Sequence, residues 1–352
     1  MNRVTTSVVV LSIALTAYGQ AKEEVGDGKK LEKHSMEIKD YLPEIHGTIR
    51  AKYEYQTQTN ENRFEVRNAR FSLSGNVHPI VAYKAEIDLS DEGSIKMLDA
   101  YARVFPLKGL DVTLGQMRVP FTIDAHRSPH LQYFPNRSFI AKQVGNVRDV
   151  GLTLGYGLND KGIPFKLEGG LFNGSGLTNQ KVWHKTLNYS LKAQLWTPDK
   201  NWNLTLSTQM MKPEEVRVNM YDAGAYYQNN RLHIEAEYLY KMYNHGAFKD
   251  VHAVNSFVNY DLPLRRVFHK ISFLARYDMM TDHSDGKMDK ETGTLVINDY
   301  ARHRVTGGIT ISLAKAFVAD LRINFEKYFY KKSGIPKESE RDKIVVEFMT
   351  RF

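Results

Sequence analysis

The chain has 352 residues, of which 42% are hydrophobic and 25% are charged, and it carries a formal net charge of +8 with no cysteine. Beyond residue 17 no apolar run approaches the ~18 residues of a membrane-spanning helix, which excludes a helical transporter. The lack of cysteine excludes a disulfide framework, thiolate metal sites and a cysteine nucleophile, and the mild positive charge suits anionic partners without choosing among them.

Residues 1–21 predict a secretory signal peptide. Arg3 gives the positive start, Val8–Ala17 forms a short apolar core, and the small residues Gly19 and Ala21 suit cleavage. An uncleaved membrane anchor would need a longer apolar run. We therefore expect the protein to leave the cytoplasm.

A charged segment, residues 22–43, follows the predicted signal peptide and ends at Pro43. Its few large apolar residues predict a flexible periplasmic tail. From residue 44 onward, apolar residues recur at every second position, which is the period of a β-strand rather than of a helix. In Glu44–Thr57, for example, apolar and small residues occupy one face and polar residues the other. No amphipathic helix of any length interrupts this pattern, so we predict one all-β domain over residues 44–352.

We count about sixteen such strands, starting near residues 44, 64, 80, 95, 110, 149, 163, 185, 202, 216, 231, 251, 268, 301, 318 and 342. Each strand with its connection then takes roughly 19 residues, enough for the 9–11 residues of a membrane strand. Tight connections alternate with connections that are mostly longer or more polar. A β-sandwich or propeller has no reason for this asymmetry, whereas an outer-membrane barrel has short turns on one side and longer loops on the other. The pattern predicts a 16-stranded antiparallel transmembrane β-barrel.

Aromatic residues crowd the expected strand ends, as in the aromatic girdle of a membrane barrel. They are Tyr53, Tyr55, Tyr226, Tyr227, Tyr238, Tyr240, Tyr243, Tyr328, Phe329 and Tyr330. The chain also stops inside a strand whose one face carries Ile344, Val346, Phe348, Thr350 and Phe352. Such an ending resembles the closing strand of bacterial outer-membrane barrels, which is read during insertion. We therefore predict that Phe348 and Phe352 form the insertion signal.

Several short segments follow one another in a characteristic order and spacing. They are RNARFSLSG (67–75), LDAYAR (98–103), LGQMRVPF (114–121), RDVGL (148–152), GLFNG (170–174) and FLARYD (273–278), with residues 306–313 and 319–326 near the end. In this order the sequence resembles the phosphate-selective porin O and P family. The resemblance covers about residues 44–352. It implies a homotrimeric, 16-stranded porin whose third extracellular loop folds inward to constrict the pore.

The longest connection, Phe121–Arg148, is the third on the long-loop side and is the candidate constriction. Its bases outnumber its one acid, Asp124. A ring of Arg and Lys replaces the hydration shell of an anion and excludes cations. We predict an anion-binding constriction formed by Arg127, Arg137, Lys142 and Arg148. The alternative is a solvated loop that caps the barrel without selecting solutes.

The expected lumen wall carries mixed charge. Its predicted basic residues are Arg50, Lys52, Arg70, Lys84, Arg103, Arg118, Lys192 and Arg322. The predicted acidic residues are Glu54, Glu86, Asp88, Asp99, Glu235, Glu237, Asp320 and Glu326. Because such residues can neutralise each other, general diffusion with a mild anion preference fits the sequence as well as true phosphate selectivity.

The remaining functional classes have weaker support. The sequence contains no G-x-S-x-G elbow, H-E-x-x-H helix or P-loop, so we predict no enzyme, no cofactor and no metal site. Its basic residues are dispersed among acids, which argues against nucleic-acid binding. The acidic loop 281–300 could hold divalent cations that bridge lipopolysaccharide, but a solvated surface loop fits its spacing better.

We therefore predict a passive bacterial outer-membrane porin that prefers anions such as phosphate. Its expected partners are lipopolysaccharide, outer-membrane lipid and the barrel-assembly machinery. The alternative function is a non-selective barrel that serves as a component of an outer-membrane assembly or uptake complex.

Overall fold

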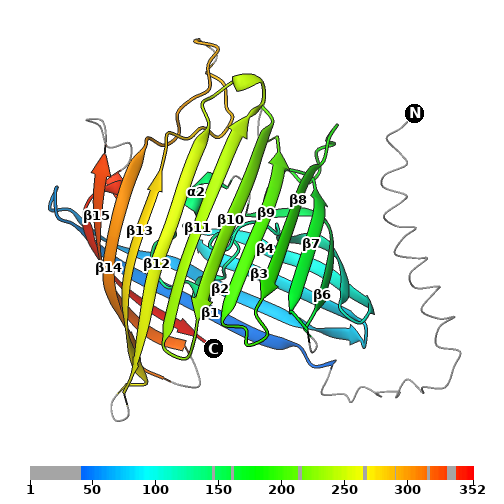
Figure 1. The fold of residues 1–352 in the computed structure, drawn as a ribbon, viewed down its shortest axis with the longest axis horizontal. Helices are drawn as coiled ribbons and strands as arrows, with labels where there is room; N and C mark the ends of the chain where they lie inside the picture. The colour runs from blue at the N-terminus through cyan, green and yellow to red at the C-terminus, as the bar shows by residue number, and fades with distance from the viewer. Residues whose placement is uncertain are drawn as a thin grey trace, which may run out of the picture.

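The computed structural model describes residues 41–144, 147–159, 162–212, 216–264, 268–289, 291–314, 318–330 and 338–352. In these residues, sixteen antiparallel strands form one closed barrel (Figure 1). Each strand pairs with its neighbours in the chain, and β1 pairs with β16 to close the cylinder. The predicted 16-stranded antiparallel barrel is confirmed. The predicted signal peptide and most of the predicted tail, residues 1–40, lie outside the described residues.

The strands begin close to where the alternating pattern predicted them, each within three residues. They are β1 (Glu44–Gln56), β2 (Asn62–His78), β3 (Val81–Asp91), β4 (Ser94–Leu107), β5 (Leu110–Arg118), β6 (Arg148–Leu158), β7 (Phe165–Phe172), β8 (Asn188–Trp196), β9 (Trp202–Met211), β10 (Val218–Gln228), β11 (Leu232–Tyr243), β12 (Val251–Pro263), β13 (Lys270–Met280), β14 (Arg302–Ser312), β15 (Val318–Tyr330) and β16 (Lys343–Arg351). The short helices are η2 (Pro129–Leu131), α2 (Ile140–Gln143), η3 (Asn244–Gly246) and η4 (Glu338–Glu340). No helix among the described residues has the length and apolarity needed to cross a membrane.

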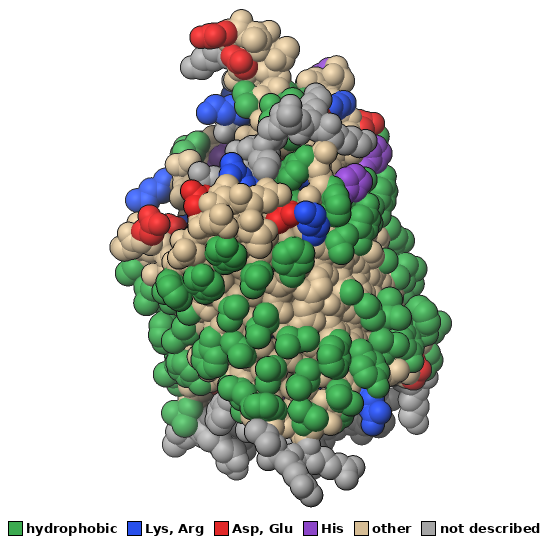
Figure 2. Space-filling model, turned by 90° about the vertical axis from the view of Figure 1, so that its left-hand side faces the viewer, with side chains coloured by type: hydrophobic (Ala, Val, Ile, Leu, Met, Phe, Trp, Pro, Cys, Tyr) green, Lys and Arg blue, Asp and Glu red, His purple; other side chains and the backbone are tan. Residues whose placement is uncertain are grey.

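The two faces of the barrel wall differ sharply in polarity. On β8, Leu191 is 46% exposed while the next residue, Lys192, is 3% exposed. On β11, Tyr238 is 42% exposed while Glu237 is 2% exposed. The face of the molecule shown in Figure 2 accordingly carries a broad band of hydrophobic side chains, with charged side chains gathered mainly above it. This arrangement inverts that of a water-soluble protein and is typical of a barrel that faces lipid outside and polar groups inside.

The aromatic residues predicted as a girdle divide between the two faces. Tyr238 and Phe329 are exposed on the outer wall, as a girdle requires. Tyr243 and Tyr328, by contrast, are 3% and 5% exposed and pack in the interior. Tyr226, which stacks on the buried His233, and Tyr330, which stacks on Tyr328, also lie on the inner face. The girdle prediction is therefore wrong for these four residues, because it used their nearness to strand ends and ignored which face the period of two assigns them.

The carboxyl-terminal residue completes the junction between β1 and β16. The main-chain N–H of Gly47 donates to the Phe352 carbonyl at 2.8 Å, and the Phe352 N–H donates to the Gly47 carbonyl at 3.1 Å. The Phe352 ring lies over Gly47, and its centroid is 6.4 Å from that of Phe71. A residue without a side chain at position 47 thus leaves room for the terminal ring.

The Gly47→Leu substitution is expected to reduce assembled barrel several-fold, because any β-carbon at position 47 would collide with the Phe352 ring. Assembly can be measured as heat-modifiable protein in the outer-membrane fraction. Gly307→Leu is the matched control, since no heavy atom lies within 4 Å of a β-carbon at Gly307. Equal assembly of the two variants would refute a role for this contact.

Candidate functional site

The connection between β5 and β6 runs over residues 119–147, close to the predicted 121–148. Because β6 begins at Arg148, this arginine belongs to the barrel wall, whereas the sequence pattern predicted it in the connection. The connection contains the one-turn helices η2 and α2 and is hereafter the 119–147 segment.

The first part of the segment is held by side chains from β8, β9 and β11. Lys192 donates to the Thr122 carbonyl at 2.6 Å, and the Thr122 N–H donates to the Ser207 hydroxyl at 3.1 Å. The Glu237 carboxylate accepts the Asp124 N–H at 3.2 Å. All three wall side chains are buried and lie on the polar face of their strands.

The second part of the segment is held from β1, β13 and β14. Its partners there are buried charged side chains that bond to its main chain. These bonds are Arg50 to the Pro135 carbonyl (2.7 Å), Arg276 to the Asn136 carbonyl (2.8 Å), Arg304 to the Arg137 carbonyl (2.7 Å) and the Phe139 N–H to Asp278 (3.0 Å). The segment therefore bonds to polar-face side chains on strands from β8 round to β1. Sequence reasoning missed Arg276, Asp278 and Arg304, although their even spacing within strands placed them on the polar face.

Arg127 of the segment is neutralised by carboxylates. It lies 2.6 Å from Glu235 of β11 and 3.4 Å from Asp124. Burial alone would lower the pKa of Arg127, but these two carboxylates outweigh it and hold the pKa above its ordinary value. Arg127 therefore adds little net charge to the interior.

Lys142 and Arg148 are also paired with acids. Lys142 forms an ion pair with Glu340 of η4. Arg148 lies 2.6 Å from Asp99 of β4 and 3.1 Å from Glu86 of β3. Three of the four basic residues predicted at the constriction thus have carboxylate partners in other parts of the barrel.

Arg137, the fourth, meets Arg118 at a shared carbonyl. Arg137 donates to the Arg127 carbonyl at 3.4 Å and to the Ala125 carbonyl at 3.0 Å. Arg118 donates to the same Arg127 carbonyl at 3.5 Å and to the His126 carbonyl at 3.3 Å. Within the described part of the chain, neither arginine has an ion pair within 4.0 Å, and Arg118 Nη2 has no hydrogen-bond partner.

These two guanidinium groups therefore form a positively charged pair with no carboxylate within 4.0 Å among the described residues, while the more distant Asp124 still attracts Arg137. Burial lowers the pKa of Arg137 to about 10, so the group is still protonated at neutral pH. A guanidinium group with unused N–H donors is suited to bind an oxyanion or halide.

Most of the other predicted wall bases pair with acids on the same strand or on a neighbouring one. The pairs are Arg50–Glu347 (2.7 Å), Lys52–Glu54 (3.0 Å), Arg70–Asp88 (2.9 Å), Lys84–Asp99 (2.8 Å), Arg103–Asp111 (3.9 Å) and Arg322–Glu347 (3.1 Å). Such pairs line the wall with fixed dipoles but contribute little net charge.

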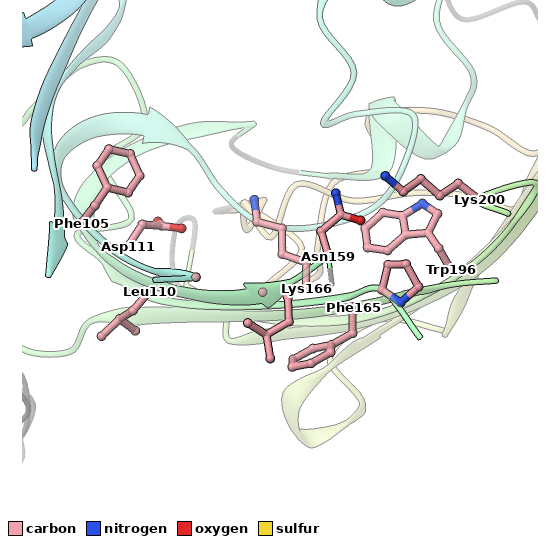
Figure 3. A pocket seen from close by; sticks show the side chains of 12 residues that line it. Phe105, Leu110, Asp111, Asn159, Phe165, Lys166, Trp196 and Lys200 are labelled. Carbon is pink, nitrogen blue, oxygen red and sulfur yellow. The ribbon is translucent and has the colours of Figure 1, made fainter. Parts of the chain in front are cut away.

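A recess of about 560 Å³ lies at the tight-turn ends of β5 to β8. Lys166, Asn159 and Lys200 extend to one side of the strands there, whereas Leu110 and Phe165 extend to the other (Figure 3). Lys166 pairs with Glu168 at 2.6 Å. The recess therefore presents amine and amide donors at one end of the barrel.

The sequence matches the family model of phosphate-selective porins O and P over residues 44–250, which is more than half of the chain. The chain belongs to this porin family. The match spans β1 to β11 and the 119–147 segment, whereas the resembling segments 273–278, 306–313 and 319–326 lie beyond it. No curated protein matches the sequence of this porin.

Solved porin-like barrels share the fold at low sequence identity. OmpF of Salmonella typhi, in complex with daunomycin, has 11% identity and a TM-score of 0.62, covering 90% of this chain and 99% of OmpF. OprB of Pseudomonas putida has 11% identity and a TM-score of 0.61, covering 88% of this chain and 94% of OprB. OmpT of Vibrio cholerae, an outer membrane protein solved in a trimer form, has 11% identity and a TM-score of 0.57, covering 88% of this chain and 98% of OmpT. The family and the fold together indicate an outer-membrane channel rather than an enzyme.

Proposed function

We propose that this porin is a passive channel that prefers anions, and that Arg118 and Arg137 provide the preference. The observation that carries the proposal is the meeting of two guanidinium groups at the Arg127 carbonyl without a carboxylate partner. Two positive charges held this close together attract an anion and can replace part of its hydration shell. Because most other wall bases are paired, this arginine pair dominates the net charge that a solute meets.

The 119–147 segment forms the constriction in this proposal, as the inward-folded third extracellular loop. Its bonds to polar-face side chains on strands from β8 round to β1 support this position. Of the residues predicted from the sequence, Arg137 acts directly on the solute. Arg127, Lys142 and Arg148, with their carboxylate partners, fix the shape of the opening.

The lysines at the tight turns extend the anion path in this proposal. Lys166 and Lys200 share one side of the recess at the barrel end. Positive charge at a channel mouth raises the local concentration of anions and speeds their entry. The field is modest, since Glu168 pairs with Lys166.

The cellular setting follows from the same barrel. We infer export by the amino-terminal signal peptide, insertion by the barrel-assembly machinery through Phe348 and Phe352, and contact with lipopolysaccharide and outer-membrane lipid. Both phenylalanines are exposed on the barrel surface, which suits reading by another protein. A homotrimer is proposed because the family consists of porins and one similar barrel was solved as a trimer.

Phosphate titration in planar bilayers tests the substrate class. Stepwise channels in KCl should be blocked saturably by phosphate, since its oxygens accept the free N–H groups of the arginine pair. Arg137→Gln should weaken the block about tenfold, whereas Lys249→Gln, which alters an exposed residue paired with Asp282, should not. Open channels without block would leave a general porin. A folded barrel without channels would favour a component of an assembly or uptake complex.

A further inference from the structure

The recess at the tight-turn ends of β5 to β8 exists because the inner face of β6 carries no side chains there. Leu154 and Tyr156 are exposed on the outer wall, so the alternation of the strand places Gly155 and Gly157 on the inner face. A β-carbon at Gly157 would come within 3.3 Å of the Lys166 side chain, which borders the hollow. The volume of about 560 Å³ falls within the roughly 300–1,000 Å³ that is usual for small-molecule sites.

An accessible aromatic ring forms one end of the recess. Trp196 follows Leu195, which is exposed on the outer wall, and therefore points to the inner face. Its indole Nε1 donates to the Tyr226 hydroxyl at 3.0 Å, which fixes the ring. Figure 3 shows Trp196 on the same side of the strands as Lys166 and Lys200. The ring is only half-buried, and because its one donor is already used, it offers a solute an apolar face.

The charged side chains of the recess leave one cation without an acid. Lys166 pairs with Glu168 at 2.6 Å, and Asp111, the acid of the lining, lies 3.9 Å from Arg103. Lys200 is exposed and has no ion pair within 4.0 Å among the residues that the structure describes. These described side chains therefore leave one excess positive charge, at Lys200.

The acid next to Lys200 in the sequence does not cancel this charge inside the recess. The Asp199 carboxylate is turned into its own loop, where it accepts the Asn201 main-chain N–H at 3.1 Å and the Asn201 side-chain amide at 2.7 Å. Asp199 does not line the recess, whereas the exposed Asn159 does and adds an amide donor. The recess thus combines an apolar ring with one cation and a hydrogen-bond donor.

This combination fits an organic anion better than an inorganic one. A cation and an amide donor suit a carboxylate, and the face of an indole suits a flat ring. Inorganic phosphate would use the cation and leave the indole in contact with water.

We propose that this recess binds aromatic monocarboxylates, with the carboxylate at Lys200 and Asn159 and the ring against Trp196. The proposal rests on the proposed function in that it takes the recess as part of the anion path, and it names the class of organic anion that this path accepts. The binding itself is measured at equilibrium, without ion flow.

The test uses benzoate and the fluorescence of Trp196 in the full-length protein in detergent. The chain has three tryptophans, and Trp183→Phe with Trp202→Phe removes the other two, both of which are exposed. Benzoate at low salt should change the remaining fluorescence saturably. Acetate has the charge without the ring, and benzyl alcohol has the ring without the charge. In competition with benzoate, each should need a concentration at least about tenfold higher.

Lys200→Gln in the same background should raise the half-saturating benzoate concentration about fivefold, the upper range for an exposed ion pair. The shift should shrink at high salt, because salt screens exposed charges. Lys181→Gln is the matched control, since Lys181 is an exposed lysine in the connection between β7 and β8 that does not line the recess. All variants are first checked for a heat-modifiable barrel.

Fluorescence that does not saturate with benzoate would overturn the proposal, as would equal half-saturating concentrations in Lys200→Gln and Lys181→Gln. Equal competition by acetate and inorganic phosphate would overturn it in favour of a site that recognises charge alone. Binding of benzyl alcohol as tight as that of benzoate would overturn it in favour of a purely apolar site. A missing anion selectivity in bilayers would contradict the proposed channel function and would leave this binding result unchanged.

Discussion

Replacing Arg118 and Arg137 together by glutamine is expected to lower the chloride-to-potassium permeability ratio at least about threefold at physiological salt. A unit charge about 8 Å from the path contributes about 0.5 kcal/mol in water, with opposite signs for anion and cation. Two such charges change the ratio about thirtyfold without screening, and the Debye length of about 8 Å reduces this to a few-fold. The effect should therefore grow as the salt concentration falls. Reversal potentials in KCl gradients measure it.

The matched control removes two positive charges from exposed side chains. Arg63 and Lys249 have side chains that are 53% and 61% exposed, and each lies at an ion pair on the long-loop side. The Arg63→Gln, Lys249→Gln variant should change the permeability ratio much less, because water and salt screen exposed charges. Equal changes in both double variants would show that net charge, rather than the arginine pair, determines the selectivity.

Asp278→Ala is expected to loosen the 119–147 segment and to destabilise the barrel by about 3–5 kcal/mol, as is usual when one partner of a buried ion pair is removed. Asp278 is fully buried, accepts the Phe139 N–H at 3.0 Å, and pairs with Arg304 at 2.6 Å. Its loss leaves Arg304 with a more distant carboxylate, Glu326 at 3.5 Å. Denaturant unfolding in detergent measures the free energy, and single-channel recording should show larger, noisier currents.

Glu168→Gln is the comparison for this prediction. Glu168 pairs with the partly exposed Lys166 and makes no hydrogen bond to the described residues of the 119–147 segment. Removing this pair should cost about 0–1 kcal/mol and add no noise to the single-channel current. If Asp278→Ala unfolded like Glu168→Gln and conducted like the wild type, the anchoring role of Asp278 would be wrong.

The barrel could be predicted from sequence because its signal is local. A strand that separates lipid from a polar interior must alternate at every second residue, as in Leu191 and Lys192, so no knowledge of the partner strand is needed. Strand starts followed directly from this alternation. The errors at Tyr243 and Tyr328 arose where position along the strand was used in place of face.

The site could be predicted only in part, because charge neutralisation depends on which strands the 119–147 segment contacts. The residues near Arg127 in sequence include one acid, Asp124. The carboxylate closest to Arg127 is nevertheless that of Glu235, on a strand far away in the sequence. In the same way, Arg118 and Arg137 meet because the intervening chain turns back at the Arg127 carbonyl. Local composition correctly indicated a basic connection but could not tell paired arginines from unpaired ones.

The most direct test of the anion preference is the reversal potential of the purified wild-type porin in a KCl gradient. The arginine pair predicts a reversal potential with the same sign as the chloride equilibrium potential. The magnitude of this reversal potential should grow as the mean salt concentration is lowered. A potential near zero, or one set by potassium, would contradict the proposed role of Arg118 and Arg137.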